Sequence, residues 1–272
     1  MSINRTVCVL FWLVAALLST VLSPSAASAD PFPAGQPAGL YDGDGCLRPL
    51  RVGYLPGRAP YQGASADGAV SGFDIETARD VVQAAGCQPE FVAVGWPRAL
   101  LLLERGVIDA LPGASFSAER ATYALFSAPY RREEFALYVR MGEGEAFPLT
   151  SLRDVGPMRF RLALNSDALY GPEVADLMTL PDFRRQVVLV RGVEQPGLVS
   201  IGRVDGYLLD TGTASAYNAS VSRSMRLVRH PAVTIDNGPV LFMFSRLTVP
   251  QGLIDRVNQR ISARSVTAEA VQ

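Results

Sequence analysis

Lysine is absent from this 272-residue chain, and histidine occurs only once, as His230. The 25 basic residues are therefore all arginines, and with 26 acidic residues they give a formal net charge of −1. This charge excludes the strongly basic surface with which proteins bind nucleic acids. Because no cysteines or carboxylates cluster around His230, the sequence predicts no metal site. We expect this histidine at the surface or in a loop, beside Pro231.

Long apolar runs are also scarce, and the only one, residues 7–22, follows the positive charge of Arg5. This order, with the small residues 27–29 (Ala-Ser-Ala) before Asp30, is typical of a secretory signal peptide over residues 1–29. An uncleaved membrane anchor is the alternative, but about 16 apolar residues fall short of the ~20 that a spanning helix needs. No cysteine after the run is placed for lipidation. We therefore expect a secreted, cleaved protein that is free in the periplasm.

Cysteine is rare as well, and of the three in the chain Cys8 lies inside the apolar run. The other two, Cys46 and Cys87, each precede an apolar segment that reads as a strand, residues 50–54 and 89–94. If these strands are parallel neighbours, both thiols lie at the same edge of a sheet, and in an oxidising space we expect a disulfide. The alternative is a pair of small buried residues that never meet.

The first half of the mature chain alternates between strand and helix patterns. An amphipathic stretch begins near Ser71-Gly72-Phe73-Asp74, which offers cap-type residues, and Gly86 ends it. A second helix follows and ends at Gly106. The expected elements are strand 50–54, a helix with Ile75, Ala78, Val82 and Ala85 on one face, strand 91–94, helix 96–105 and strand 107–111. This order predicts a parallel sheet with helices on its faces.

The same order recurs in the second half, as strand 162–164, helix 170–178, strand 187–190, short helix 198–201 and strand 204–209. The two halves also share a local phrase, Gly106-Val107-Ile108-Asp109 and Gly202-Arg203-Val204-Asp205. In both phrases the glycine can take the positive φ that closes a helix directly into a strand. The sequence thus predicts two lobes of one design.

Two further strands, residues 135–141 and 239–245, are expected to cross between the lobes. The chain would then finish in an amphipathic helix, residues 250–263, with Leu253, Ile254, Val257 and Ile261 packed onto the first lobe. The expected domains are a first lobe over residues 30–132 with a linker at 30–45, a second lobe over 133–245, and a return to the first lobe over 246–272. Two crossings make a hinge that can close a cleft, and ligands of such α/β sheets bind beyond the carboxyl ends of the strands.

Seven phrases at these loops carry a more specific signal. In chain order they are Leu50-Arg51-Val52-Gly53-Tyr54, Pro60-Tyr61, Ser71-Gly72-Phe73-Asp74, Trp96-Pro97-Arg98, Gly106-Val107-Ile108-Asp109, Ala118-Glu119-Arg120 and Phe126-Ser127-Ala128-Pro129-Tyr130. Together they resemble the family 3 extracellular solute-binding proteins, the polar amino acid receptors of ABC importers. The resemblance covers nearly the whole mature chain. It implies an α/β, two-lobed fold of the periplasmic-binding-protein type II, with a mostly parallel sheet in each lobe.

The resemblance also implies roles for particular residues. Arg120 stands where the family places the arginine that grips the α-carboxylate of the ligand, and a guanidinium matches a carboxylate in shape and charge. Ser117 would cap the helix that begins there, so that its free amides also favour an anion. Ser115 matches a hydroxyl that bonds the ligand, and Asp210 matches a carboxylate that accepts from the α-ammonium. Trp96 falls where an apolar wall is expected, with core packing as the alternative.

Two positions depart from the family pattern. The loop with Ser166 and Asp167 stands where relatives have a glycine-containing turn that binds the carboxylate, and Asp167 would oppose an anion there. Arg58 stands where an aromatic ring often covers the side chain of the ligand. These departures leave two alternatives: a ligand whose second carboxylate reaches Arg58, or a ligand that is not an amino acid.

The sequence as a whole favours binding without catalysis, since it shows no nucleophile with a base and no metal set. We expect a monomer that captures a small zwitterionic or acidic solute for an ABC permease in the inner membrane, with no cofactor. One alternative is a periplasmic dehydratase of the cyclohexadienyl type, whose general acid would be Glu173 or Asp167. Another is a sensory or accessory receptor with the same fold.

Overall fold

The computed structural model describes residues 40–143 and 146–269, and all of them belong to one compact unit. The predicted signal peptide, residues 1–29, and most of the predicted linker lie outside the described residues. Within the described part of the chain, no helix is both long and apolar enough to cross a membrane.

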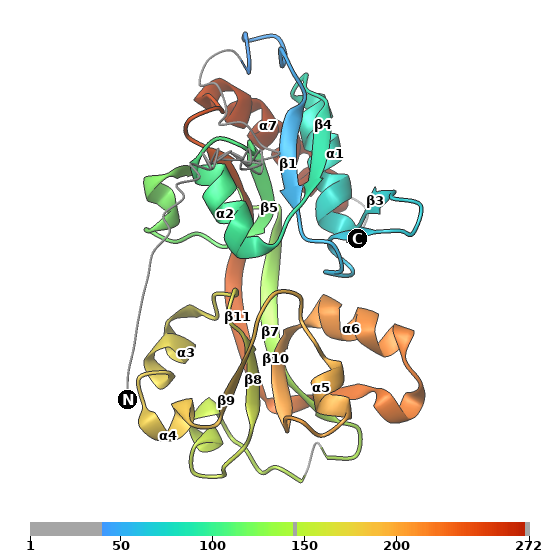
Figure 1. The fold of residues 1–272 in the computed structure, drawn as a ribbon, viewed down its shortest axis with the longest axis vertical. Coiled ribbons are helices and arrows are strands. Elements are labelled where there is room, and N and C mark those ends of the chain that lie inside the picture. The colour runs from blue at the N-terminus through green and yellow to red at the C-terminus, as the bar shows by residue number, and fades with distance from the viewer. Residues whose placement is uncertain (1–39, 144–145, 270–272) are drawn as a thin grey trace, which may run out of the picture. The chain divides into compact units, whose positions relative to one another are not determined.

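One nine-stranded sheet runs through the molecule in the order β4-β1-β5-β11-β7-β10-β8-β9, with β6 paired to β11 (Figure 1). Its strands are β1 Leu50–Tyr54, β4 Pro89–Ala93, β5 Ala110–Ala114, β6 Ala124–Phe126, β7 Arg131–Arg140, β8 Leu162–Asn165, β9 Val187–Val190, β10 Gly206–Asp210 and β11 Leu227–Ser245. A small separate sheet pairs β2 Gly63–Ala64 with β3 Val70–Ser71. The pairs β1/β4, β1/β5, β10/β8 and β8/β9 are parallel, as the alternating pattern predicts.

The two long strands β7 and β11 pair with each other antiparallel and connect two lobes (Figure 1). One lobe carries α1 Phe73–Ala84, α2 Trp96–Glu104 and α7 Gln251–Glu269, and the other carries α3 Gly171–Leu177, α4 Pro181–Arg184, α5 Gly197–Ser200 and α6 Thr211–Ser220. Three short 3₁₀ helices lie at Arg120–Thr122, Leu152–Val155 and Arg223–Met225. The predicted fold class, two lobes joined by two crossings, is confirmed.

Each lobe has apolar clusters on both faces of its part of the sheet. On β11, Phe242 and Phe244 pack with α1 and α7, whereas Met243 between them packs with α2. On β10, Leu208 packs with α3 and α4, whereas its neighbours pack with α5 and α6. This alternation follows from the two-residue period of a strand. The predicted inward residues of the last helix, Leu253, Ile254, Val257 and Ile261, are all buried.

The repeated phrase of the two halves is an aspartate clamp. Asp109 accepts hydrogen bonds from the backbone N–H of Arg51 at 2.8 Å and from its Nε at 3.1 Å. Asp205 does the same for Arg161, from the backbone N–H at 2.8 Å and from Nε at 3.1 Å. Each aspartate thereby ties the turn after a helix to the start of a neighbouring parallel strand. The glycines before them have φ of 68° and 72°, as predicted for Gly106 and Gly202.

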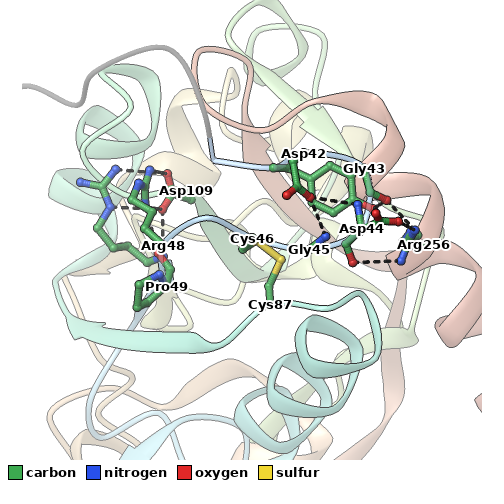
Figure 2. Close-up of a disulfide and its surroundings, with 12 residues drawn as sticks. Asp42, Gly43, Asp44, Gly45, Cys46, Arg48, Pro49, Cys87, Asp109 and Arg256 are labelled. Carbon is green, nitrogen blue, oxygen red and sulfur yellow. Dashed lines mark hydrogen bonds and ion pairs between the residues drawn. A yellow bond between two sulfur atoms is a disulfide. The ribbon is translucent and has the colours of Figure 1, made fainter.

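The predicted disulfide is present, between Cys46 and Cys87, whose Cα atoms are 4.8 Å apart (Figure 2). It joins the segment before β1 to the turn before β4, and the parallel pairing of Leu50 with Pro89 places both cysteines at one edge. A backbone hydrogen bond from Cys46 to Gly86 supports the same turn.

Several local predictions were wrong. The strand placed at 107–111 is Ala110–Ala114, because the three residues after Gly106 form a tight turn that leads Asp109 to its clamp. The first helix begins after Gly72 without a side-chain cap, since Asp74 turns inward instead. His230 is buried within β11 and its Nε2 lies 3.0 Å from the Phe147 carbonyl oxygen. Among the described residues, no His, Cys and carboxylate side chains group as a metal site.

Candidate functional site

A cavity of about 40 Å³ lies between the lobes, beyond the carboxyl ends of several strands. The first lobe contributes Leu55, Arg58, Trp96, Gly113, Ser115 and Arg120, and the strand β7 contributes Glu133 and Phe135. The second lobe contributes Asn165, Asp167, Ala168, Leu169, Gly192, Val193 and Glu194. This is the place at which ligands of α/β sheets are expected. Five of the seven ligand residues predicted from the sequence line this cavity.

Arg120 is the most distinctive of these residues. Its side chain is buried, its Nη1 donates to the Ser115 carbonyl at 2.8 Å, and its guanidinium lies 5.3 Å from the centre of the Trp96 ring. Within the described residues it forms no ion pair, and the Ser115 carbonyl is the one acceptor of its guanidinium. Burial lowers the pKa of the guanidinium, and the opposing effects of Tyr123 and Glu119 do not offset it. A buried arginine in this state favours an anionic ligand.

The backbone around Arg120 differs from the prediction. Ser117 does accept a hydrogen bond from the Arg120 N–H, at 3.2 Å. However, the helix that follows is only the three-residue 3₁₀ turn Arg120–Thr122. A single turn has too few free amides to form an anion site, so any carboxylate here would depend on the guanidinium itself.

Trp96 opens α2 and lies between the core of the first lobe and the cavity. Its ring belongs to the apolar cluster of α2 and β5, and it also lines the cavity beneath the Arg120 guanidinium. The indole Nε1 is buried without a hydrogen-bond partner among the described residues. Ser115 also lines the cavity, and its hydroxyl accepts a hydrogen bond from Asn237 Nδ2 on β11 at 3.4 Å.

Arg58 reaches into the cavity from the loop after β1 and meets two glutamates that sequence reasoning missed. Its Nη2 is 3.4 Å from Glu133 Oε1 on β7, and its Nε is 4.0 Å from Glu194 Oε1 on the second lobe. Burial alone would lower the pKa of Arg58, but Glu194 and Glu133 more than offset it and raise the pKa. The sequence offered one signal for Glu133, the charged run Arg131-Arg132-Glu133-Glu134 at the start of an otherwise apolar strand.

The loop with Ser166 and Asp167 follows β8. The Asp167 N–H donates to Asn165 Oδ1 at 2.9 Å, and its Oδ2 accepts from the Gly192 N–H at 3.1 Å. Asp167 therefore lines the cavity as a carboxylate that the backbone of the second lobe already holds. Ser166 is exposed and lines a neighbouring groove instead of the cavity.

Asp210 is buried but does not line the cavity. As the N-cap of α6, its Oδ1 accepts from the N–H groups of Gly212 at 2.9 Å and Thr213 at 3.1 Å. The same oxygen accepts from the Tyr61 hydroxyl of the first lobe at 2.6 Å. Asp210 thus caps α6, and the ammonium contact that the resemblance implies stays a prediction. The carboxylate that faces the cavity from the second lobe, besides Asp167, is Glu194.

The contact between Tyr61 and Asp210 connects the lobes beside the cavity. The Arg131 guanidinium stacks over the Tyr61 ring at 4.2 Å and binds Asp74 through its Nε at 3.0 Å. A Cβ atom at Gly212 would lie 2.4 Å from the Tyr61 hydroxyl oxygen, so only glycine allows this approach. Burial and the Asp210 carboxylate raise the pKa of Tyr61, which therefore stays a hydrogen-bond donor.

A wider groove of about 470 Å³ adjoins the cavity and shares Ser115, Asn165, Ala168 and Leu169 with it. Its other lining residues are mainly apolar, and Phe116 and Leu189 on opposite sides are exposed. The groove and the cavity together form the space between the lobes.

The sequence matches the family of bacterial extracellular solute-binding proteins, family 3, over residues 50–263. The chain belongs to this family. One solved structure with a similar fold is an ancestral arginine-binding protein bound to arginine, with 20% identity and a TM-score of 0.66; the match covers 79% of this chain and 92% of that one. Another is an amino acid ABC transporter substrate-binding protein from Streptococcus pneumoniae bound to L-arginine, with 20% identity and a TM-score of 0.65. This match covers 80% of this chain and 89% of that one.

A third structure with a similar fold is a histidine kinase sensor domain with similarity to periplasmic binding proteins. It has 19% identity and a TM-score of 0.65, and the match covers 82% of this chain and 92% of that one. At these identities the likeness shows the fold alone. No curated protein sequence matches the chain.

Proposed function

We propose that this solute-binding protein captures a small amino-acid-like solute, zwitterionic or acidic, between its lobes and delivers it to an ABC permease. The observation that carries the proposal is Arg120, a buried guanidinium on the cavity wall without a carboxylate partner among the described residues. The arginine bound to two proteins of similar fold is itself an amino acid, which supports this class of ligand.

In this proposal the first lobe binds the solute carboxylate with a cation, and the second lobe binds the solute ammonium with carboxylates. The solute carboxylate would accept two hydrogen bonds from Arg120, with Ser115 beside it and Trp96 as the wall. The ammonium group would face Glu194 and Asp167 of the second lobe, and Asp210 would contribute if its contact with Tyr61 opens. A ligand with both charges satisfies both lobes only when they are closed, which gives closure its driving force.

The setting of the protein belongs to the same proposal. We place it in the periplasm as a monomer, after removal of residues 1–29, with the lobe boundaries at residues 132/133 and 245/246. The family name supports an extracytoplasmic location, and the ABC transporter protein of similar fold supports the permease partner. The proposal includes no catalysis and no cofactor.

Thermal unfolding against a panel of amino acids, dicarboxylates and small amines tests the proposal. A solute at one hundred times its dissociation constant should stabilise the protein by about 2.7 kcal/mol. We expect Arg120→Gln to lose this shift, while Arg105→Gln, an exposed arginine at the end of α2, keeps it. If no member of the panel shifts the wild-type protein, the amino-acid-like class is wrong.

A sensory role is the second candidate, because a histidine kinase sensor domain shares the fold. The two roles predict different partners for the closed protein. Crosslinking in membranes with the bound solute should capture a permease in the first case and a kinase in the second. The dehydratase alternative is tested by prephenate turnover, and Glu173, one of its two predicted acids, lies outside the cavity lining.

A further inference from the structure

Arg58 occupies the part of the cavity where carboxylates gather. Two of the three acidic side chains that line the cavity, Glu133 and Glu194, have Arg58 as their charged neighbour there. Gly113 makes room for it, since a Cβ atom at that position would lie 3.1 Å from an Arg58 Nη atom. The side chain of Arg58 is only 14% exposed.

The contacts of Arg58 are loose. Of its N–H donors, one makes a side-chain hydrogen bond among the described residues, to Glu133 at 3.4 Å, and the approach to Glu194 is 4.0 Å. Glu133 has better partners, since it also accepts from Asn237 Nδ2 at 2.8 Å and lies 3.7 Å from Arg131 Nη1. The guanidinium of Arg58 is therefore held in a buried cavity with most of its donors unfilled.

We infer that Arg58 sets the charge selectivity of the cavity. It excludes solutes with a cationic side chain and favours those whose side chain carries a hydrogen-bond acceptor, a carboxylate or a carboxamide. A second cation in this space would face Arg58 at short range in a poorly solvated site, where like charges repel strongly. An acceptor would fill donors of Arg58 that are now unfilled. The inference rests on the proposed function, with Arg120 as the anchor of the α-carboxylate.

Isothermal titration calorimetry with L-glutamate, L-glutamine, L-alanine, L-arginine and L-lysine tests this selectivity. We expect the wild-type protein to bind glutamate or glutamine at least tenfold more tightly than arginine and lysine. In Arg58→Gln the ratio should move at least tenfold toward arginine, because Glu194 then faces the cavity without its cation and Glu133 keeps only Arg131 at 3.7 Å. Arg132→Gln on the same strand as Glu133 is the control, since Arg132 is 71% exposed and pairs with Asp236.

A second variant keeps the test decisive if Arg58→Gln fails to fold. Glu194→Gln removes the counter-charge of Arg58 and weakens the ammonium contact that all amino acids share, so the ratio of the glutamate affinity to the arginine affinity should rise above that of the wild-type protein. The inference is wrong if the wild-type protein binds arginine as tightly as glutamate, or if folded Arg58→Gln keeps the wild-type ratio. If either of these results is obtained and the protein still binds alanine, only the inference about Arg58 is wrong and the proposed amino acid binding holds. Binding of none of the five would overturn this inference, and the wider thermal-unfolding panel then decides whether the proposed function fails with it.

Discussion

The aspartate clamps of the two lobes should contribute unequally to stability. Asp109 has no exposed side-chain surface and accepts from Arg48 at 2.7 and 2.8 Å, in addition to its bonds from Arg51 (Figure 2). Asp205 is 12% exposed, and its main partner Arg161 is 47% exposed. Substitution by asparagine keeps the shape of each side chain, removes its charge and replaces one accepting oxygen with an NH2 donor, and the change is the same in both lobes. The pair therefore separates the effect of burial from that of chemistry.

The magnitude follows from this exposure. Breaking a fully buried ion pair costs about 3–5 kcal/mol because it leaves an unpaired buried charge. Arg48 and Arg51 are 35% and 21% exposed, so water would relieve part of this loss. We expect Asp109→Asn to destabilise the protein by about 2–3 kcal/mol. For Asp205→Asn, whose partner is half exposed, we expect about 1 kcal/mol.

Urea denaturation at pH 7 measures both values. The midpoint should fall more for Asp109→Asn than for Asp205→Asn, with the slope unchanged, because the surface exposed on unfolding stays the same. Equal losses, or a larger loss for Asp205→Asn, would refute the argument that burial of the carboxylate decides the cost.

Three further predictions concern pH, the disulfide and the contact between the lobes. Burial would raise the pKa of Asp109 and of Asp205, but bonds from Arg48 and Arg51 in one case and Arg161 in the other hold both pKa values below the ordinary range. The stability from these carboxylates is thus fully present above the unfolded pKa of about 3.9 and is lost as pH falls below it. Melting curves between pH 6 and pH 3 should show the melting temperature fall, and fall less in Asp109→Asn. The disulfide closes a loop of sequence separation 41, so its reduction, or the double change Cys46→Ser and Cys87→Ser, should destabilise by about 4 kcal/mol, and a melting temperature that ignores reductant would contradict this. Gly212→Ala should disrupt the contact of Tyr61 with α6 and enlarge the radius of gyration in X-ray scattering, whereas Gly197→Ala, whose Cβ would meet nothing closer than 3.7 Å, should not.

The sequence predicted most of the architecture because the residues that end its helices can be recognised locally. Gly86, Gly106 and Gly202 end helices with positive φ, and a glycine in this role can be recognised without the partner strand. The apolar face of the last helix was equally readable. The lengths of β7 and β11 were not, because β7 begins with the charged run 131–134, the middle of β11 is largely polar, and the two strands pair over long sequence separations.

The site was predicted less completely, and the misses share one cause. Arg58, Trp96, Ser115, Arg120 and Asp167 follow strand ends, and all line the cavity. Glu133 and Glu194 belong to a crossing strand and to a loop of the second lobe, and only the tertiary structure brings them to Arg58. Asp210 was predicted correctly at the end of a strand, but its carboxylate accepts from the Tyr61 hydroxyl and the α6 amides and does not line the cavity. Partners across lobes cannot be assigned from spacing within one lobe.

The central claim is that Arg120 anchors an anionic group of the solute, and calorimetric titration of Arg120→Gln tests it most directly. The titrant is the amino acid that stabilises the wild-type protein most. Two charge-assisted hydrogen bonds at about 1.5–3 kcal/mol each predict at least a hundredfold weaker binding, with urea stability close to that of the wild type because Arg120 has no ion pair among the described residues. Unchanged affinity in a folded Arg120→Gln would contradict the account.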